Sequence, residues 1–354
     1  MQFRHRSLPW NIVFGAGSMQ RLPSELATLG RSRALVLTTP AQAADGLRVA
    51  ELLGAARAGV FDQARMHVPA TTVARALEVA AEVDADCTVA VGGGSTTGLG
   101  KLLALRADLD NIVLPTSYAG SEMTNIWGVT EDGKKTTGRD DRVVPTLTIY
   151  DPELTLRMPP KFAAASGMNA LAQASVNIAT DRPNPVVQAL ATDAVRALAR
   201  SLPRVLDRPG DIEARSGALY GACLAGAALG TGKTGLHHRL CHVLGGTYDT
   251  PHAETHATLL PHSIAYNAAA AADGTARLAE ALDVDDAATG LFDLGRSLGV
   301  PESLDALGVS EGDLDRVAEL AVETPLENPA PVTHQAVRSL LDDAFHGRPP
   351  PGAG

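Results

Sequence analysis

The segment DCTVAVGGGSTTGLGKLLALRA, residues 86–107, carries the clearest signal of the fold class in this chain. It starts as a short apolar run and passes through Gly92, Gly93, Gly94 and Ser95 into a segment whose apolar residues recur at helical spacing. A buried strand, a glycine turn and a helix in this order are typical of a parallel sheet with crossover helices. We expect the apolar residues of this helix to form one face.

Similar apolar runs alternate with helical patterns from Arg33 to Tyr150, namely RALVLTT, NIVLPTS and TLTIYD. After Pro159 and Pro160 the strand signals stop, and Ala-rich amphipathic segments follow. The sequence therefore predicts an α/β, Rossmann-like, dinucleotide-binding domain at 1–158, an all-α substrate and catalytic domain at 159–346, and a flexible tail at 347–354. Helices are expected at roughly 161–180, 185–202, 212–231, 233–245, 254–271, 274–282, 286–298, 311–322 and 333–344.

Composition excludes several classes of function. The formal net charge of -10 disfavours a nucleic-acid binder or a protein held on anionic lipid, because a negative field repels phosphates. Three scattered cysteines suit a reducing compartment and support no disulfide framework. The N-terminal residues lack the apolar core of a signal peptide, and no apolar stretch is long enough for a membrane span. We expect a cytoplasmic protein with a small-molecule substrate.

The glycine turn at 92–95 could bind a pyrophosphate, because free N–H groups at a helix start favour an anion and glycines let it approach closely. A tight turn without a ligand is the alternative. A second polar turn, PTSYAGSEMT at 115–124, follows the next strand, and ligands gather beyond the carboxyl ends of parallel strands. The expected cofactor-binding residues are Gly92, Gly93, Gly94, Ser95, Thr38, Thr116, Ser117, Ser121 and Thr124.

The strand RALVL ends in Thr38, Thr39 and Pro40, with no carboxylate that could hold a ribose 2′-hydroxyl or repel a 2′-phosphate. We therefore expect NADPH to be accepted as well as NADH.

Histidines concentrate between residues 235 and 262, which hold six of the ten in the chain. His238 and His242 are four apart, on one helix face, and His252 could fold back towards them after a glycine turn. Histidine suits proton transfer and metal binding near neutral pH, whereas any single one could be a hydrogen-bonded core or cap residue. His262 is the one we expect to be structural.

The charged segment DGKKTTGRDDR, residues 132–142, is typical of a solvent-exposed hairpin or loop. It could instead hold a substrate carboxylate through Lys135 and Arg139.

Taken together, the chain resembles the iron-containing alcohol dehydrogenase superfamily and, within it, the maleylacetate reductase family. The motifs that carry the resemblance are FGAG at 14–17, GGGSTTGLGK at 92–101, PTSYAGSEMTNIWG at 115–128, KTTGRD at 135–140, YDPELT at 150–155, SGMNALA at 166–172 and LHHRLCHVLGG with PHAETHA at 236–257. The resemblance implies a dehydroquinate synthase-like fold, a homodimer, and an NADH- or NADPH-dependent oxidoreductase.

In the metal-dependent members of the superfamily an Asp and three His hold the ion, and those positions fall here on Asn169, Gln173, His238 and His252. Without the carboxylate and one imidazole, the site lacks the charge and donor strength that Fe²⁺ or Zn²⁺ needs, and we predict no tightly bound catalytic metal. Gln173 and the following SVNIAT segment depart from the closer relatives too, and they border the expected substrate pocket.

The implied reaction is hydride transfer to the enone C=C of maleylacetate, which gives 3-oxoadipate. By position, His242 would lie nearest the nicotinamide, with His238 and His252 as further donors. Lys135 and Arg139 would bind carboxylates, while Tyr118 and Trp127 would line the pocket with Asn169 and Gln173. A carbonyl reductase or alcohol dehydrogenase of a biosynthetic pathway, with an ion recruited by the histidines, and a non-redox enzyme on the same fold remain alternatives.

Overall fold

The structure, a computed structural model, describes residues 2–132 and 134–351. The chain divides into two compact units, one from Ser7 to Met158 and one that joins residues up to Arg6 with Pro159 onward. The Asn184 side-chain amide donates to the Arg4 carbonyl over 3.2 Å, which ties the N-terminal segment to the second unit.

The first unit contains a parallel sheet with the strand order β1-β8-β5-β4-β2-β3. Its strands are β1 Ile12–Phe14, β2 Ala34–Leu37, β3 Arg57–Phe61, β4 Cys87–Gly92, β5 Asp110–Pro115 and β8 Leu147–Tyr150. The sequence predicted β2, β4, β5 and β8. It missed β1 and β3, which are the edge strands and are partly exposed: β1 is only three residues long, and β3 begins with Arg57 and contains a glycine.

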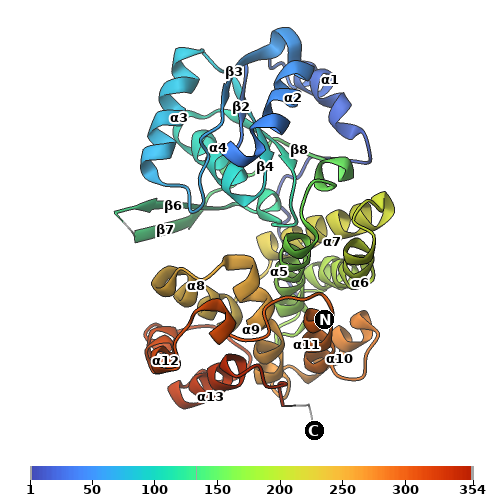
Figure 1. The fold of residues 1–354 in the computed structure, drawn as a ribbon, viewed down its shortest axis with the longest axis vertical. Helices are drawn as coiled ribbons and strands as arrows, with labels where there is room; N and C mark the ends of the chain where they lie inside the picture. The colour runs from blue at the N-terminus through green and yellow to red at the C-terminus, as the bar shows by residue number, and fades with distance from the viewer. Residues whose placement is uncertain (1, 133, 352–354) are drawn as a thin grey trace. The chain divides into compact units, whose positions relative to one another are not determined.

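Helices cover both faces of this sheet (Figure 1). They are α1 Leu22–Thr28, α2 Ala43–Leu53, α3 Ala70–Glu82 and α4 Gly94–Ala107. Alternate residues of β2 face opposite ways: Val36 packs in the core with α1 and α2, and Leu37 packs in the core with α3 and α4. The result is a three-layer α/β unit, as the sequence predicted.

The expectation of a one-faced α4 was wrong. Every residue from Leu99 to Ala104 is buried, including Lys101. The cause is that α4 packs against the sheet on one side and against α3 and the chain around β6 on others. Small Gly, Ala and Thr side chains allow this crowding.

Strands β6 Ile126–Glu131 and β7 Lys134–Arg139 form an antiparallel hairpin outside the main sheet. It projects from the unit in Figure 1, and most of β7 is exposed. The charged segment at 132–142 is therefore largely a hairpin strand, one of the two forms the sequence favoured; its residue 133 lies outside the described residues.

The second unit is helical throughout its described elements. These are α5 Pro160–Ile178, α6 Pro185–Asp207, α7 Ile212–Thr231, α8 Leu236–Tyr248, α9 His252–Asn267, α10 Ala272–Leu282, α11 Ala287–Ser297, α12 Leu314–Val322 and α13 His334–Phe345. All lie close to the predicted ranges, because the starts carry clear signals: Pro160 opens α5, and Asn184 caps α6 by accepting from Val186 N over 3.1 Å.

Helix α5 forms the centre of this unit. It is buried from Ala163 to Ser175 and packs against α6, α7 and α9. A Cβ on Gly167 would lie 2.2 Å from Leu202 Cδ2, so glycine permits the close approach of α6. Among the described residues, no helix combines the length and apolar character needed to cross a membrane.

Candidate functional site

The sheet reverses its strand order between β2 and β4. From β2 the chain proceeds to β3 on one side and then returns to β4 on the other. Ligands of open α/β sheets bind beyond the carboxyl ends of the strands at such a reversal. Thr38 follows β2, Gly92 ends β4 and Thr116 follows β5, so the three predicted polar turns end neighbouring strands.

The glycine turn has the geometry of an anion site. Gly92 has φ +157°, and a Cβ there would lie 2.4 Å from Thr96 Oγ1. A Cβ on Gly93 would lie 2.7 Å from Ser117 Oγ. Gly93 also precedes α4 without any side-chain cap, so the first amides of that helix remain available for a ligand. Gly94, the first residue of α4, is exposed, and Ser95 after it is half-buried.

The turn after β5 is fastened to the glycine turn. Thr116 N donates to Gly92 O over 3.0 Å, and Gln42 Nε2 donates to Thr116 Oγ1 over 2.6 Å. Thr38 Oγ1 donates to Gln42 O over 3.2 Å. Gln42 therefore links the ends of β2 and β5, a role that the sequence did not suggest.

Lys101 is the second residue that sequence reasoning missed. Its buried ammonium donates to the carbonyls of Ser121, Thr124 and Ile126, at 2.6, 2.8 and 2.9 Å, and lies 2.9 Å from Thr124 Oγ1. Burial lowers the pKa of Lys101 to about 7, and the nearby Glu122 opposes this shift. The Thr124 hydroxyl is thus engaged inside the protein, where it positions the 121–126 loop.

Two aromatic residues under this loop are fully buried. Tyr150 Oη donates to Glu122 Oε1 over 2.8 Å, and burial raises the pKa of Glu122. Tyr118, which the sequence proposed as a pocket wall, has no exposed surface. Its ring therefore belongs to the interior of this unit in the structure.

The residues proposed to bind carboxylates lie on the hairpin. Lys135 and Arg139 are both exposed on β7, and Arg139 Nη1 donates to Asn125 Oδ1 over 3.0 Å. Trp127 on β6 lies over Gly138, where a Cβ would be 2.6 Å from the indole ring. The hairpin therefore places a half-buried indole and two exposed cations on one small sheet.

The predicted histidines gather where α8 packs against α9. Ring centroids are 6.5 Å apart for His238 and His242, 4.5 Å for His252 and His256, and 5.2 Å for His238 and His256. His242 and His252 are exposed, whereas His238 is buried and neither of its ring nitrogens has a hydrogen-bond partner. His252 contacts His256 on the same helix, and it is His256 that contacts His237 and His238 of α8.

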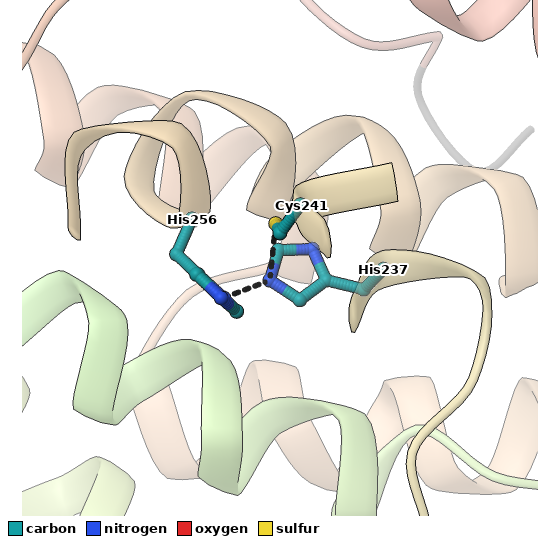
Figure 2. Close-up of side chains that lie close together, drawn as sticks. All are labelled: His237, Cys241 and His256. Carbon is teal, nitrogen blue, oxygen red and sulfur yellow. Dashed lines mark hydrogen bonds between the residues drawn. The ribbon is translucent and has the colours of Figure 1, made fainter. Parts of the chain in front are cut away.

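Behind them lies a buried group that sequence reasoning did not single out: His237, Cys241 and His256 (Figure 2). His237 Nε2 is 2.9 Å from His256 Nδ1 and 3.9 Å from Cys241 Sγ. Burial lowers the pKa of His237, His238 and His256, so these imidazoles are neutral near pH 7. The spacing of four between His237 and Cys241 was visible in the sequence, but the approach of His256 requires the packed helix pair.

Asn169 and Gln173 lie one turn apart on α5, and both are buried. Asn169 Oδ1 has no hydrogen-bond partner, and the main-chain carbonyl of Gln173 accepts from Asn177 Nδ2 over 2.9 Å. His262, expected to be structural, is buried on α9 with its ring edge-on to Phe292.

Comparisons with known proteins cover both units. Residues 9–152 match the family model of iron-containing alcohol dehydrogenase, and residues 163–345 match the C-terminal model of the Fe-containing alcohol dehydrogenase family. The maleylacetate reductase of Sphingobium indicum is 50% identical over 350 residues, which are 99% of each chain.

Solved structures give the same result. The crystal structure of maleylacetate reductase from Agrobacterium tumefaciens has a TM-score of 0.96 at 48% identity and covers 99% of this chain and 100% of its own. That of Rhizobium sp. strain MTP-10005 has a TM-score of 0.95 at 48% identity and covers 99% of each chain. The chain is therefore an oxidoreductase that belongs to the iron-containing alcohol dehydrogenase family, with maleylacetate reductases among its similar relatives.

Proposed function

We propose that the protein reduces the enone C=C of maleylacetate with NADH or NADPH and gives 3-oxoadipate. The observation that carries the proposal is its similarity, over nearly the whole chain, to proteins named maleylacetate reductase. The nicotinamide supplies a hydride to one alkene carbon, the ketone oxygen takes up the resulting charge as an enolate, and a proton is added at the other carbon.

The cofactor site in this proposal is the edge at the reversal between β2 and β4. The glycines and Ser95 at the start of α4 would bind the pyrophosphate, since the uncapped amides and the helix dipole favour an anion. Thr38, Thr116, Ser117 and Ser121 would contribute from the neighbouring turns. No carboxylate follows β2 at Thr38, so the proposal includes acceptance of NADPH.

The substrate half uses the histidines of α8 and α9. His242 and His252, exposed on this unit, are the residues proposed to meet substrate and nicotinamide, and His238 offers ring nitrogens without a partner. A neutral imidazole can donate its ring N–H to the developing enolate oxygen. Lys135 and Arg139 are proposed to bind carboxylates of the substrate.

The family description implies iron, so the donor set must be tested against that ion. The positions that hold the metal in the metal-dependent relatives carry two amides here, of Asn169 and Gln173, and two imidazoles, of His238 and His252. Iron(II) prefers a site with at least one anionic oxygen, which an amide does not supply. The unpartnered Asn169 Oδ1 and His238 nitrogens fit hydrogen bonding to substrate better than iron binding. We therefore include metal independence in the proposal and route no step through an ion.

Isotope transfer tests the reaction. With maleylacetate and nicotinamide cofactor deuterated at the transferred position, we expect 3-oxoadipate carrying one deuterium on a former alkene carbon, located by mass spectrometry of the product. Deuterium on an alcohol carbon would show a carbonyl reductase instead, and absence of transfer to either would reject reductase activity on this substrate.

A further inference from the structure

Of the groups that the proposed reaction leaves unused, the His237–Cys241–His256 group has the most specific chemistry. One donor atom from each residue lies within 4.8 Å of the other two, and all three residues are buried. Within the described residues, it is the one group of three or more histidine, cysteine or acidic side chains whose donor atoms lie close enough together to hold an ion.

We propose that His237, Cys241 and His256 form a binding site for one borderline-soft divalent cation such as Zn²⁺. None of the three residues stands at a position that holds iron in the metal-dependent relatives, so this site is separate from the family's. It does not depend on the proposed reaction.

The donor spacing is close to what zinc requires. With zinc–nitrogen bonds of about 2.0–2.1 Å and zinc–sulfur bonds of about 2.3 Å, tetrahedral geometry separates donors by about 3.3–3.6 Å. The distances from His237 Nε2, 2.9 Å to His256 Nδ1 and 3.9 Å to Cys241 Sγ, lie on either side of that range. Small side-chain rotations would admit an ion between them (Figure 2).

The surroundings provide the second shell that histidine ligands use. Ser263 Oγ is 3.2 Å from His237 Nδ1, so that nitrogen can donate to the hydroxyl and leave Nε2 with a lone pair for the metal. His237 also lines a cavity of about 280 Å³ in the helical unit, which gives an ion a route to the site.

The proton balance is simple. On binding, the Cys241 thiol loses its proton to solvent, because a coordinating thiol binds as thiolate. The proton that His256 Nδ1 shares with His237 moves to His256 Nε2, which has no partner now. The thiolate supplies the anionic, soft donor that favours zinc over magnesium or calcium. The group therefore has two alternative states: one with the ion bound, and one without it in which His237 and His256 share a hydrogen bond.

The test uses the full chain, freed of metal by chelation and kept reduced without thiols, and titrated with Co²⁺. We expect one cobalt per chain, a near-ultraviolet thiolate-to-cobalt charge-transfer band, and loss of that band when Zn²⁺ displaces cobalt. Cys241→Ser should abolish the band, while Cys223→Ser, which removes another buried thiol of the same unit, should keep it. His256→Gln should weaken cobalt binding at least tenfold.

Three other results would overturn the proposal: the absence of cobalt binding, cobalt binding without a thiolate band, and a band that survives Cys241→Ser. His252→Gln separates this site from the family's position: cobalt binding and the band should both remain, whereas cobalt binding that is lost in His252→Gln and kept in His256→Gln would place the ion at the family's position. If Cys241→Ser fails to fold, the wild-type band and the His256→Gln affinity decide the matter.

Discussion

Replacing Lys101 with methionine tests how the cofactor edge is held. The change keeps most of the side-chain volume but removes the Lys101 donor from the carbonyls of Thr124 and Ile126, whereas the Ser121 carbonyl still accepts from the Thr124 amide and hydroxyl. Each buried carbonyl that loses its partner costs about 1–3 kcal/mol, so two cost at least about 2 kcal/mol. In a domain of this size that corresponds to a melting temperature lower by about 4–8 °C.

Calorimetry and cofactor titration measure the two consequences. We expect a lower melting temperature for the transition of the α/β unit, and weaker NADH binding because the 121–126 loop loses its position. Lys161→Met is the matched control, since Lys161 is exposed at the start of α5 and should change neither quantity. Wild-type melting and NADH affinity in Lys101→Met would refute the assignment of Lys101 as the residue that positions this loop.

Three further predictions follow from the same geometry. Gly93→Asp should abolish cofactor binding, because it places a carboxylate at the start of α4 and a Cβ 2.7 Å from Ser117 Oγ; retained NADH affinity would reject the site, and Gly312→Asp, with open space around it, is the control. His242→Ala should keep cofactor binding while turnover falls on the order of a hundredfold, and unchanged turnover would remove His242 from the mechanism. Burial lowers the pKa of His262 from 6.5 to about 4. Between these pH values the unfolded chain binds more protons than the folded one, so the free energy of unfolding decreases as the pH is lowered. From about pH 7 to about pH 5 this histidine should cost about 2 kcal/mol, and an equal loss in His262→Gln by denaturant unfolding would contradict that attribution.

The sequence predicted best where local signals and burial agree. Strand β4 is a continuous apolar run that ends in glycines, and α5 opens with Pro159 and Pro160, so both elements were found. The edge strand β3 was not, because its residues are partly exposed and the alternation that marks a strand is weak there. Helix α4 was found, but its burial was underestimated, since nothing local shows how many elements surround a helix.

Residues that act through tertiary contacts escaped prediction for the same reason. Lys101 would be assigned to a solvent-exposed face by its charge, although it stands beside Leu102 and Leu103 in a segment with little polar surface of its own. The histidine-rich segment was recognised from composition. Which members are buried and which exposed depended on how α9 packs on α8, so His256 was not distinguished from its neighbours.

We propose that this member of an iron-containing family reduces maleylacetate without a metal. NADH oxidation with fresh maleylacetate tests this, on enzyme chelated until residual iron and zinc are far below one per chain. We expect full turnover that added Fe²⁺ does not increase. Turnover that disappears with the metal and returns in proportion to added Fe²⁺ would show that the reaction depends on iron.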